Sequence, residues 1–103
     1  MRDLEPYYQY FADFIVDAIS EPWQKAWFAV EMEEDYESYQ GLYVADGGSE
    51  EKSFVLDDDM QSKVREFWEE FRKGGGDVWY SFTFTLFPDG KFELDFEYEP
   101  PSE

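Results

Sequence analysis

The sequence predicts an α+β domain, with two helices on one face of a mostly antiparallel sheet of four to five strands. Two observations lead to this fold class. In two segments, apolar side chains recur every three or four residues, as on one face of an amphipathic helix. In the other segments, apolar and polar side chains alternate, as in a strand with one covered face. The expected order is α-β-β-(β)-α-β-β, and the length of 103 residues suits one domain, 1–103.

The first predicted helix spans residues 4–19. Asp3 is the expected N-cap, and Pro6 is tolerated because it falls in the first turn. Pro22 ends the helix, because the residue before a proline disfavours helical backbone angles. The apolar positions that form one face are Leu4, Tyr7, Tyr8, Phe11, Phe14, Ile15, Ala18 and Ile19.

Two strands are predicted at 23–32 and 38–45, separated by an acidic turn at 33–35. In the first strand, Ala26, Phe28, Val30 and Met32 point one way, and Trp23, Lys25, Trp27, Ala29 and Glu31 point the other. In the second, Leu42 and Val44 face opposite to Tyr39, Gly41 and Tyr43. A loop at 46–49 and a short third strand at 54–56 follow.

The second predicted helix begins at 57–59 and ends at 74–76, because glycine accepts a left-handed C-cap conformation. Asp58 and Gln61 have the spacing of a capping box. The acids at 57–59 and 33–35 could attract a hard cation, but neither run has the ligand spacing of a calcium-binding loop. Helix capping and a solvated turn are therefore the preferred interpretations. The apolar face of this helix consists of Met60, Val64, Phe67, Trp68 and Phe71.

The last segment predicts a β-hairpin with one apolar and one polar face. Its turn is Pro88-Asp89-Gly90, in which proline presets one backbone angle and glycine accepts a positive one. The apolar face carries Val78, Tyr80, Phe82, Phe84, Leu86, Phe92, Leu94, Phe96 and Tyr98. The opposite face carries Trp79, Ser81, Thr83, Thr85, Glu93, Asp95 and Glu97. Residues 99–103 predict a loose acidic tail.

The charge balance is the most unusual feature of the composition. Asp and Glu number 26 against 8 Lys and Arg, a formal net charge of −18. Such a charge repels nucleic acid and anionic lipid, and it attracts basic proteins. The absence of His and Cys removes the commonest general base, every thiol nucleophile and the commonest metal ligands. We therefore expect a binding protein with no catalytic residues, no cofactor and no metal.

One face of the predicted sheet is left for a partner if both helices cover the side that bears Phe28, Leu42 and Phe82. Exposed aromatic side chains ringed by charges are typical of protein interfaces. The simpler interpretations are cross-strand packing for the rings and a solvated strand that resists aggregation for the acids. The candidate partner-binding residues are Trp27, Glu31, Tyr43, Trp79, Thr83, Glu93, Asp95 and Glu97.

Three runs in the C-terminal hairpin carry a family resemblance. They are a Trp-led strand with alternating Thr and Phe (WYSFTFTL from Trp79), a turn exit (DGKF from Asp89) and an acidic-aromatic ending (DFEY from Asp95). With Pro22-Trp23 opening the first strand after a helix, they make the chain resemble the YezG-like antitoxin or immunity protein family. Trp79 and Gly90 occupy the family's Trp and Gly positions.

The resemblance implies an immunity protein that binds a cognate toxin domain inside the producing cell and blocks its active site or disrupts its fold. Such toxins belong to the polymorphic, LXG-like class and are often nucleases, which need cationic surfaces for phosphate. The alternatives are an acidic DNA mimic that occupies a DNA-binding protein, and an acidic domain without a dedicated partner. We expect a cytoplasmic monomer or weak homodimer. The negative charge opposes contact with nucleic acid and with anionic membranes, and no apolar run approaches membrane-spanning length.

Overall fold

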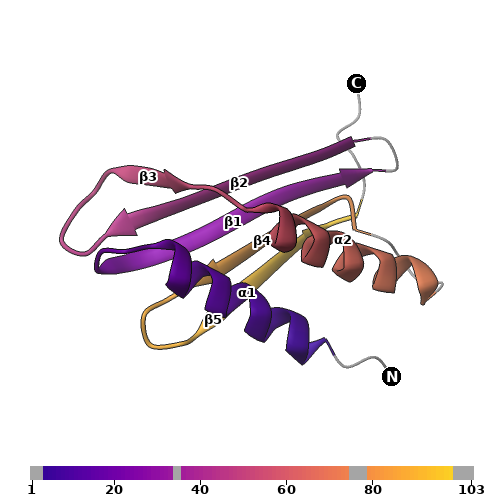
Figure 1. The fold of residues 1–103 in the computed structure, drawn as a ribbon, viewed down its shortest axis with the longest axis horizontal. Helices are drawn as coiled ribbons and strands as arrows, with labels where there is room; N and C mark the ends of the chain where they lie inside the picture. The colour runs from indigo at the N-terminus through magenta and orange to yellow at the C-terminus, as the bar shows by residue number, and fades with distance from the viewer. Residues whose placement is uncertain (1–3, 34–35, 75–78, 99–103) are drawn as a thin grey trace.

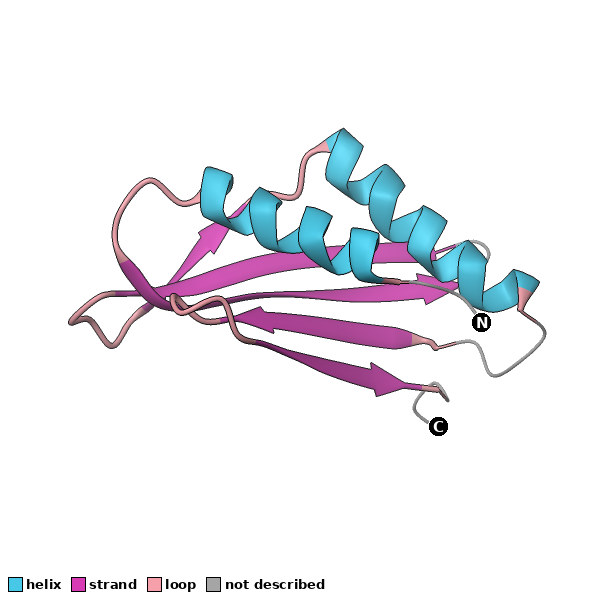
Figure 2. Ribbon diagram, turned by 90° about the horizontal axis from the view of Figure 1, so that it is seen from below, coloured by secondary structure: helices cyan, strands magenta, loops and turns pink. Residues whose placement is uncertain are grey.

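The structure, a computed structural model, describes residues 4–33, 36–74 and 79–98. Its elements are α1 (Glu5–Ala18), β1 (Trp23–Glu33), β2 (Tyr36–Ala45), β3 (Glu51–Phe54), α2 (Asp58–Lys73), β4 (Ser81–Leu86) and β5 (Phe92–Glu97). The strands form one antiparallel sheet in the order β3-β2-β1-β4-β5 (Figure 1). Both helices lie on one face of the sheet and leave the other uncovered (Figure 2). The predicted fold class and element order are confirmed.

The core lies between the helices and the sheet and consists mainly of aromatic rings. Phe11 of α1 meets Phe28 of β1 edge to face, with ring centroids 5.2 Å apart. Phe67 of α2 lies 5.1 Å from Phe82 of β4. All four rings are fully buried. The apolar faces of both helices thus converge on one side of the sheet, as their residue spacing predicts.

The cap of α2 differs from the predicted capping box. The side chain of Asp57 accepts the backbone N–H of Met60 at 2.9 Å, so Asp57 is the N-cap and Asp58 is the first helical residue. At the other end, Gly74 has right-handed backbone angles (φ −71°), so the prediction of a left-handed C-cap is wrong for this residue. In α1 the N-cap is Leu4, so the prediction of Asp3 as the N-cap is wrong. The predicted features that lie outside the described residues are 34–35, Gly75, Gly76, Val78 and the tail at 99–103, and Asp3 itself also lies outside them.

The third strand begins and ends earlier than the predicted 54–56, because β3 spans Glu51–Phe54. Phe54 pairs with Gly41 of β2, and a Cβ on Gly41 would lie 2.7 Å from the Phe54 ring. Glycine is therefore required for the ring to lie against β2. Leu56, predicted as strand, follows β3 and is buried in the core.

The turn between β4 and β5 has the predicted chemistry. Gly90 has a φ of +92°, and its N–H donates to the carbonyl of Phe87 at 3.0 Å. The side chain of Asp89 accepts the N–H of Lys91 at 3.0 Å. A glycine with positive φ after a tight turn matches the right-handed twist of the strands it joins.

A bulge at the start of β1 turns Trp23 toward the helices. Trp23 pairs with Ala45 of β2, whereas Lys25 pairs with Val44, so Gln24 is an extra residue on β1. The extra residue interrupts the alternation of side chains. Trp23 packs against the core, and its predicted place beside Lys25 on the uncovered face is wrong.

A second irregularity, before β4, has the same effect on Trp79. Ser81 pairs with Glu97 of β5, and the N–H of Tyr80 also donates to the carbonyl of Glu97. Two residues on one chain segment therefore oppose one residue on β5, and the alternation breaks between them. Trp79 is 1% exposed and lies in the core, while Tyr80 faces the other way. The predicted faces of Trp79 and Tyr80 are both wrong.

The faces of β2 are the reverse of the prediction. Tyr43 pairs with Ala26, and Tyr39 pairs with Val30, so both tyrosines lie on the helix side. Leu42 pairs with Trp27 on the uncovered side. Because β2 carries apolar side chains on both faces, alternation alone could not choose between them. The structure places the tyrosine rings against the core.

Candidate partner-binding face

The uncovered side of the sheet presents three cross-strand rows. Paired residues on neighbouring antiparallel strands point to the same face. In the order β2, β1, β4, β5, the rows are Leu42, Trp27, Thr85 and Glu93; Gln40, Ala29, Thr83 and Asp95; and Ser38, Glu31, Ser81 and Glu97. We call these side chains, together with Lys25, the open face. Neither helix covers it (Figure 2).

Three acids of the open face form a ladder along β5, at the edge of the sheet. Glu93, Asp95 and Glu97 are exposed and occupy alternate positions, about 6.8 Å apart for a rise of about 3.4 Å per residue. Within the described part of the chain, no ion pair joins any of them to a lysine or arginine. Their placement together on the polar face of the last strand agrees with the prediction. The ladder is a dense, accessible negative charge.

Small and hydroxylated side chains separate the acid ladder from the centre of the sheet. Thr83 lies between Ala29 and Asp95, and Thr85 lies between Trp27 and Glu93. Thr85 is only 9% exposed. No bulky side chain of β4 rises from the open face, so a partner's surface can lie flat against this band.

Trp27 supplies the large apolar surface of the open face. Its ring is partly buried and lies in the row between Leu42 and Thr85. The ammonium group of Lys25 lies 5.2 Å from the centroid of this ring, a cation–π contact. An amphipathic indole on a face that also bears accessible acids has the composition of an interface hot spot.

Two tyrosines hold the Glu31 carboxylate. The sequence predicted Tyr80 on the opposite face and assigned Tyr36 to no strand. Tyr80 donates its hydroxyl to Glu31 at 3.2 Å, and Tyr36 donates at 3.5 Å. Partial burial raises the pKa of Tyr80, and the nearby Glu31 carboxylate raises it further. The hydroxyl therefore stays protonated and keeps donating. Tyr36 was missed because the predicted strand began two residues later, and Tyr80 because of the bulge.

Two predicted site residues do not belong to the open face. Trp79 is buried among core rings, and its carbonyl accepts the indole N–H of Trp68 at 3.0 Å. Tyr43 lies on the helix side and donates its hydroxyl to Glu21 at 2.6 Å. The hydrogen bonds from Tyr43 and then from Lys52 lower the pKa of Glu21. The structure brings together the remaining candidates, Trp27, Glu31, Thr83, Glu93, Asp95 and Glu97.

The positive charges of the described chain are concentrated on the other side of the molecule. Arg65 of α2 forms an ion pair with Glu37 and lies over the Trp68 ring. Lys63 pairs with Glu66 and lies over the Tyr7 ring. Because these cations neutralise acids near the helices, the acids of the open face keep their charge available to a partner.

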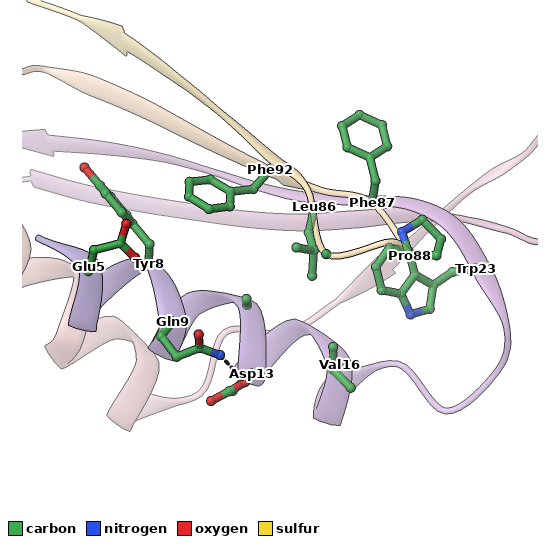
Figure 3. A pocket seen from close by; sticks show the side chains of 12 residues that line it. Glu5, Tyr8, Gln9, Asp13, Val16, Trp23, Leu86, Phe87, Pro88 and Phe92 are labelled. Carbon is green, nitrogen blue, oxygen red and sulfur yellow. Dashed lines mark hydrogen bonds between the residues drawn. The ribbon is translucent and has the colours of Figure 1, made fainter.

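A groove of about 300 Å³ lies on the helix side, between α1 and the β4–β5 turn. Figure 3 shows Tyr8 of α1 and Phe92 of β5 near one end, with Val16, Trp23 and Pro88 near the other. Its lining is mainly apolar, with Glu5 and Asp13 among the polar groups. Such a groove suits an apolar side chain better than a reaction centre.

Neither metal-binding nor membrane-spanning features occur in the described parts of the chain. No group of three or more Asp or Glu residues there could hold a metal ion. No helix there is long and apolar enough to cross a membrane.

A family model described as "Immunity protein YezG-like" matches residues 49–103, more than half of the chain and the part that contains β3, α2, β4 and β5. No curated protein sequence matches the chain.

Proposed function

Since this chain belongs to the YezG-like immunity protein family, we propose that it neutralises a basic bacterial toxin domain, of the nuclease kind, by covering it with the open face. The observation that carries the proposal is the acid ladder Glu93, Asp95 and Glu97, which is exposed, has no ion pair in the described chain and lies on a face that no helix covers. The proposed action is binding and requires no chemistry from this protein.

Charge complementarity supports a nuclease as the target. A nuclease needs a cationic surface to hold phosphate, and an acidic inhibitor can occupy that surface in place of the nucleic acid. Electrostatic steering raises association rates to on the order of 10⁸ M⁻¹s⁻¹ at low salt, which suits rapid capture of a toxin. Such toxins would be of the polymorphic class that the family resemblance implies.

Affinity and specificity would come from different parts of the open face. The acid ladder attracts and orients a basic partner, but exposed charges contribute little binding energy each. Trp27 offers the buried aromatic contact on which tight interfaces depend. Glu31 is held by Tyr36 and Tyr80, and a fixed carboxylate loses less entropy when it pairs with an arginine.

The open face favours this function over a DNA mimic. A mimic calls for acids spaced regularly over an elongated surface, in place of the phosphates of a duplex. On the open face, three acids lie along β5 at one edge, and the central strands carry Trp27, Ala29 and Leu42 as well as Glu31. An apolar centre with an acidic edge is an interface for a protein.

The proposal is tested by titration calorimetry against the toxin domain encoded next to this protein. We expect tight binding at low salt that weakens as the salt concentration rises, because the ladder charges are exposed and are screened. A nuclease assay on the same domain should show loss of activity at one equivalent. Absence of binding at low salt would overturn the proposal.

A further inference from the structure

β5 is an edge strand, and one row of its backbone hydrogen-bonding groups faces away from the rest of the described sheet. It pairs with β4 on one side, and no described strand lies on its other side (Figure 1). Phe87 donates its N–H to the carbonyl of Lys91, which makes these two residues a hydrogen-bonded pair. Because hydrogen-bonded pairs alternate with non-bonded pairs along antiparallel strands, the backbone N–H and C=O groups of Glu93, Asp95 and Glu97 bond to β4. The N–H and C=O groups of Phe92, Leu94 and Phe96 therefore point outward, away from β4.

The side chains of β5 form two rows with different chemistry. The acid ladder lies on the open face, and Phe92, Leu94 and Phe96 lie on the helix side. The helices cover this apolar row only in part, since Phe92 is 39% exposed and Leu94 and Phe96 are half-buried. Tyr98, just beyond the strand, is 48% exposed and stacks on Phe96. An added strand would extend both rows.

We propose that β5 is the docking edge for an extended segment of the toxin, which pairs antiparallel with it and carries alternating basic and apolar residues. This inference rests on the proposed function and names the mode of contact. Basic side chains would lie opposite Glu93, Asp95 and Glu97, and apolar side chains opposite Phe92, Leu94 and Phe96. Addition to the sheet would satisfy the outward backbone groups and cover the exposed rings.

The charge of β5 selects a basic partner over a second copy of this chain. Two copies paired edge to edge through β5 would bring two acid ladders close together, and like charges directly opposite each other are destabilising. The other edge of the sheet, β3, is four residues long and carries Lys52, so it offers neither the length nor the uniform charge. The two edges of this sheet are therefore not equivalent.

The groove on the helix side lies next to this edge. The Tyr8 and Phe92 rings lie 5.6 Å apart at its β5 end, and Glu5 also lines it (Figure 3). An apolar side chain of the added strand, opposite Phe92, would lie beside these rings. The edge therefore has room for larger apolar residues at this end of the incoming strand.

A peptide of alternating Lys and Val residues, about as long as β5, tests the edge without knowledge of the toxin. We expect it to bind and to protect the amides of Phe92, Leu94 and Phe96 from hydrogen exchange. In antiparallel pairing, the residues opposite these three donate their N–H groups to β5. N-methylation of the Val residues should therefore abolish binding, whereas N-methylation of the Lys residues should leave it unchanged. Equal effects of the two modifications, or protection of other strands, would overturn the proposal.

The variant Leu94→Pro tests the same edge against the toxin domain. It removes an outward N–H, and proline is tolerated on an edge strand when its missing N–H faces outward. We expect its affinity to fall about tenfold or more, while the control Leu94→Val, which keeps the N–H, binds as the wild type does. Unchanged affinity of folded Leu94→Pro would overturn edge pairing and leave the proposed function standing. Failure of the wild-type protein to bind the toxin would instead remove the proposed function. A wild-type dimer that Leu94→Pro disperses would show that a second copy occupies the edge, and would also overturn the proposal.

Discussion

The backbone N–H of Tyr80 donates to the carbonyl of Glu97 at 2.6 Å, although Glu97 is already paired with Ser81. This bulge decides the role of the tryptophan that precedes it. Without the extra residue, Trp79 would point to the open face with Ser81 and Thr83. With it, Trp79 is buried against the Phe67 and Phe82 rings.

Replacement of Trp79 by alanine is therefore expected to affect folding. Truncation of a fully buried tryptophan costs about 3–5 kcal/mol, because apolar contacts are lost and a cavity remains. Urea denaturation followed by circular dichroism should show that loss in the free energy of unfolding. A variant as stable as the wild type would place Trp79 outside the core.

Replacement of Trp27 by alanine should have the opposite outcome. Its ring lies partly exposed on the open face, so we expect the free energy of unfolding to change by only about 1 kcal/mol. Toxin binding should weaken by about 2 kcal/mol or more, as for an aromatic hot spot. Calorimetry and urea denaturation on the same sample separate the two effects. Unchanged affinity would remove Trp27 from the interface.

Replacement of Gly41 by alanine should destabilise the sheet at the β2–β3 pair. The new Cβ would lie 2.7 Å from the Phe54 ring and 2.8 Å from the Phe54 carbonyl oxygen, so strand and ring would have to move. Overpacking of this kind costs about 1–3 kcal/mol. Gly48→Ala is the control, since its Cβ would have no neighbour closer than 3.4 Å. A thermal melt in which both variants unfold like the wild type would contradict the pairing of Phe54 with Gly41.

The pH dependence of stability should depend on Glu37. A hydrogen bond from Tyr39, and then the Arg65 guanidinium, hold the pKa of Glu37 below its usual value. A lowered folded-state pKa stabilises the fold above the unfolded-state pKa, and this stability is lost as the pH falls through the folded value. The difference in unfolding free energy between wild type and Glu37→Gln should therefore be largest at neutral pH. It should shrink as the pH is lowered below about 4.5.

The matched variant for this effect is Tyr39→Phe, which keeps the ring and removes the hydrogen bond to Glu37. Its pH dependence below neutrality should be weaker than that of the wild type. Stability differences that stay constant from pH 7 to acid, in either variant, would contradict the assigned cause.

Much of the fold follows from the sequence because its signals are local. The helical spacing of Phe11 and Ile15, or of Val64 and Phe67, names the buried face of each helix, and alternation names the strands. The acid ladder was placed correctly because the Gly90 turn starts β5 in a fixed register after β4.

The side-chain directions that were predicted wrongly depend on long-range geometry, which the alternation of apolar and polar residues does not encode. One extra residue at Gln24 and one before Ser81 reverse the faces of Trp23 and Trp79, and nothing in the spacing marks these bulges. The faces of β2 depend on whether its tyrosines or its aliphatic residues pack under the helices. The structure decides this through partners distant in the sequence, such as Glu21 for Tyr43.

We propose that the acid ladder of the open face attracts the toxin. The direct measurement is the toxin affinity of the triple variant Glu93→Gln, Asp95→Asn and Glu97→Gln, against a control that removes three remote exposed acids, Asp17→Asn, Asp46→Asn and Glu50→Gln. We expect the ladder variant to bind about tenfold or more weakly, with a reduced dependence on salt, and the control to bind nearly as the wild type does. Equal weakening in both variants would show that net charge, and not this face, recruits the partner, and would contradict the claim.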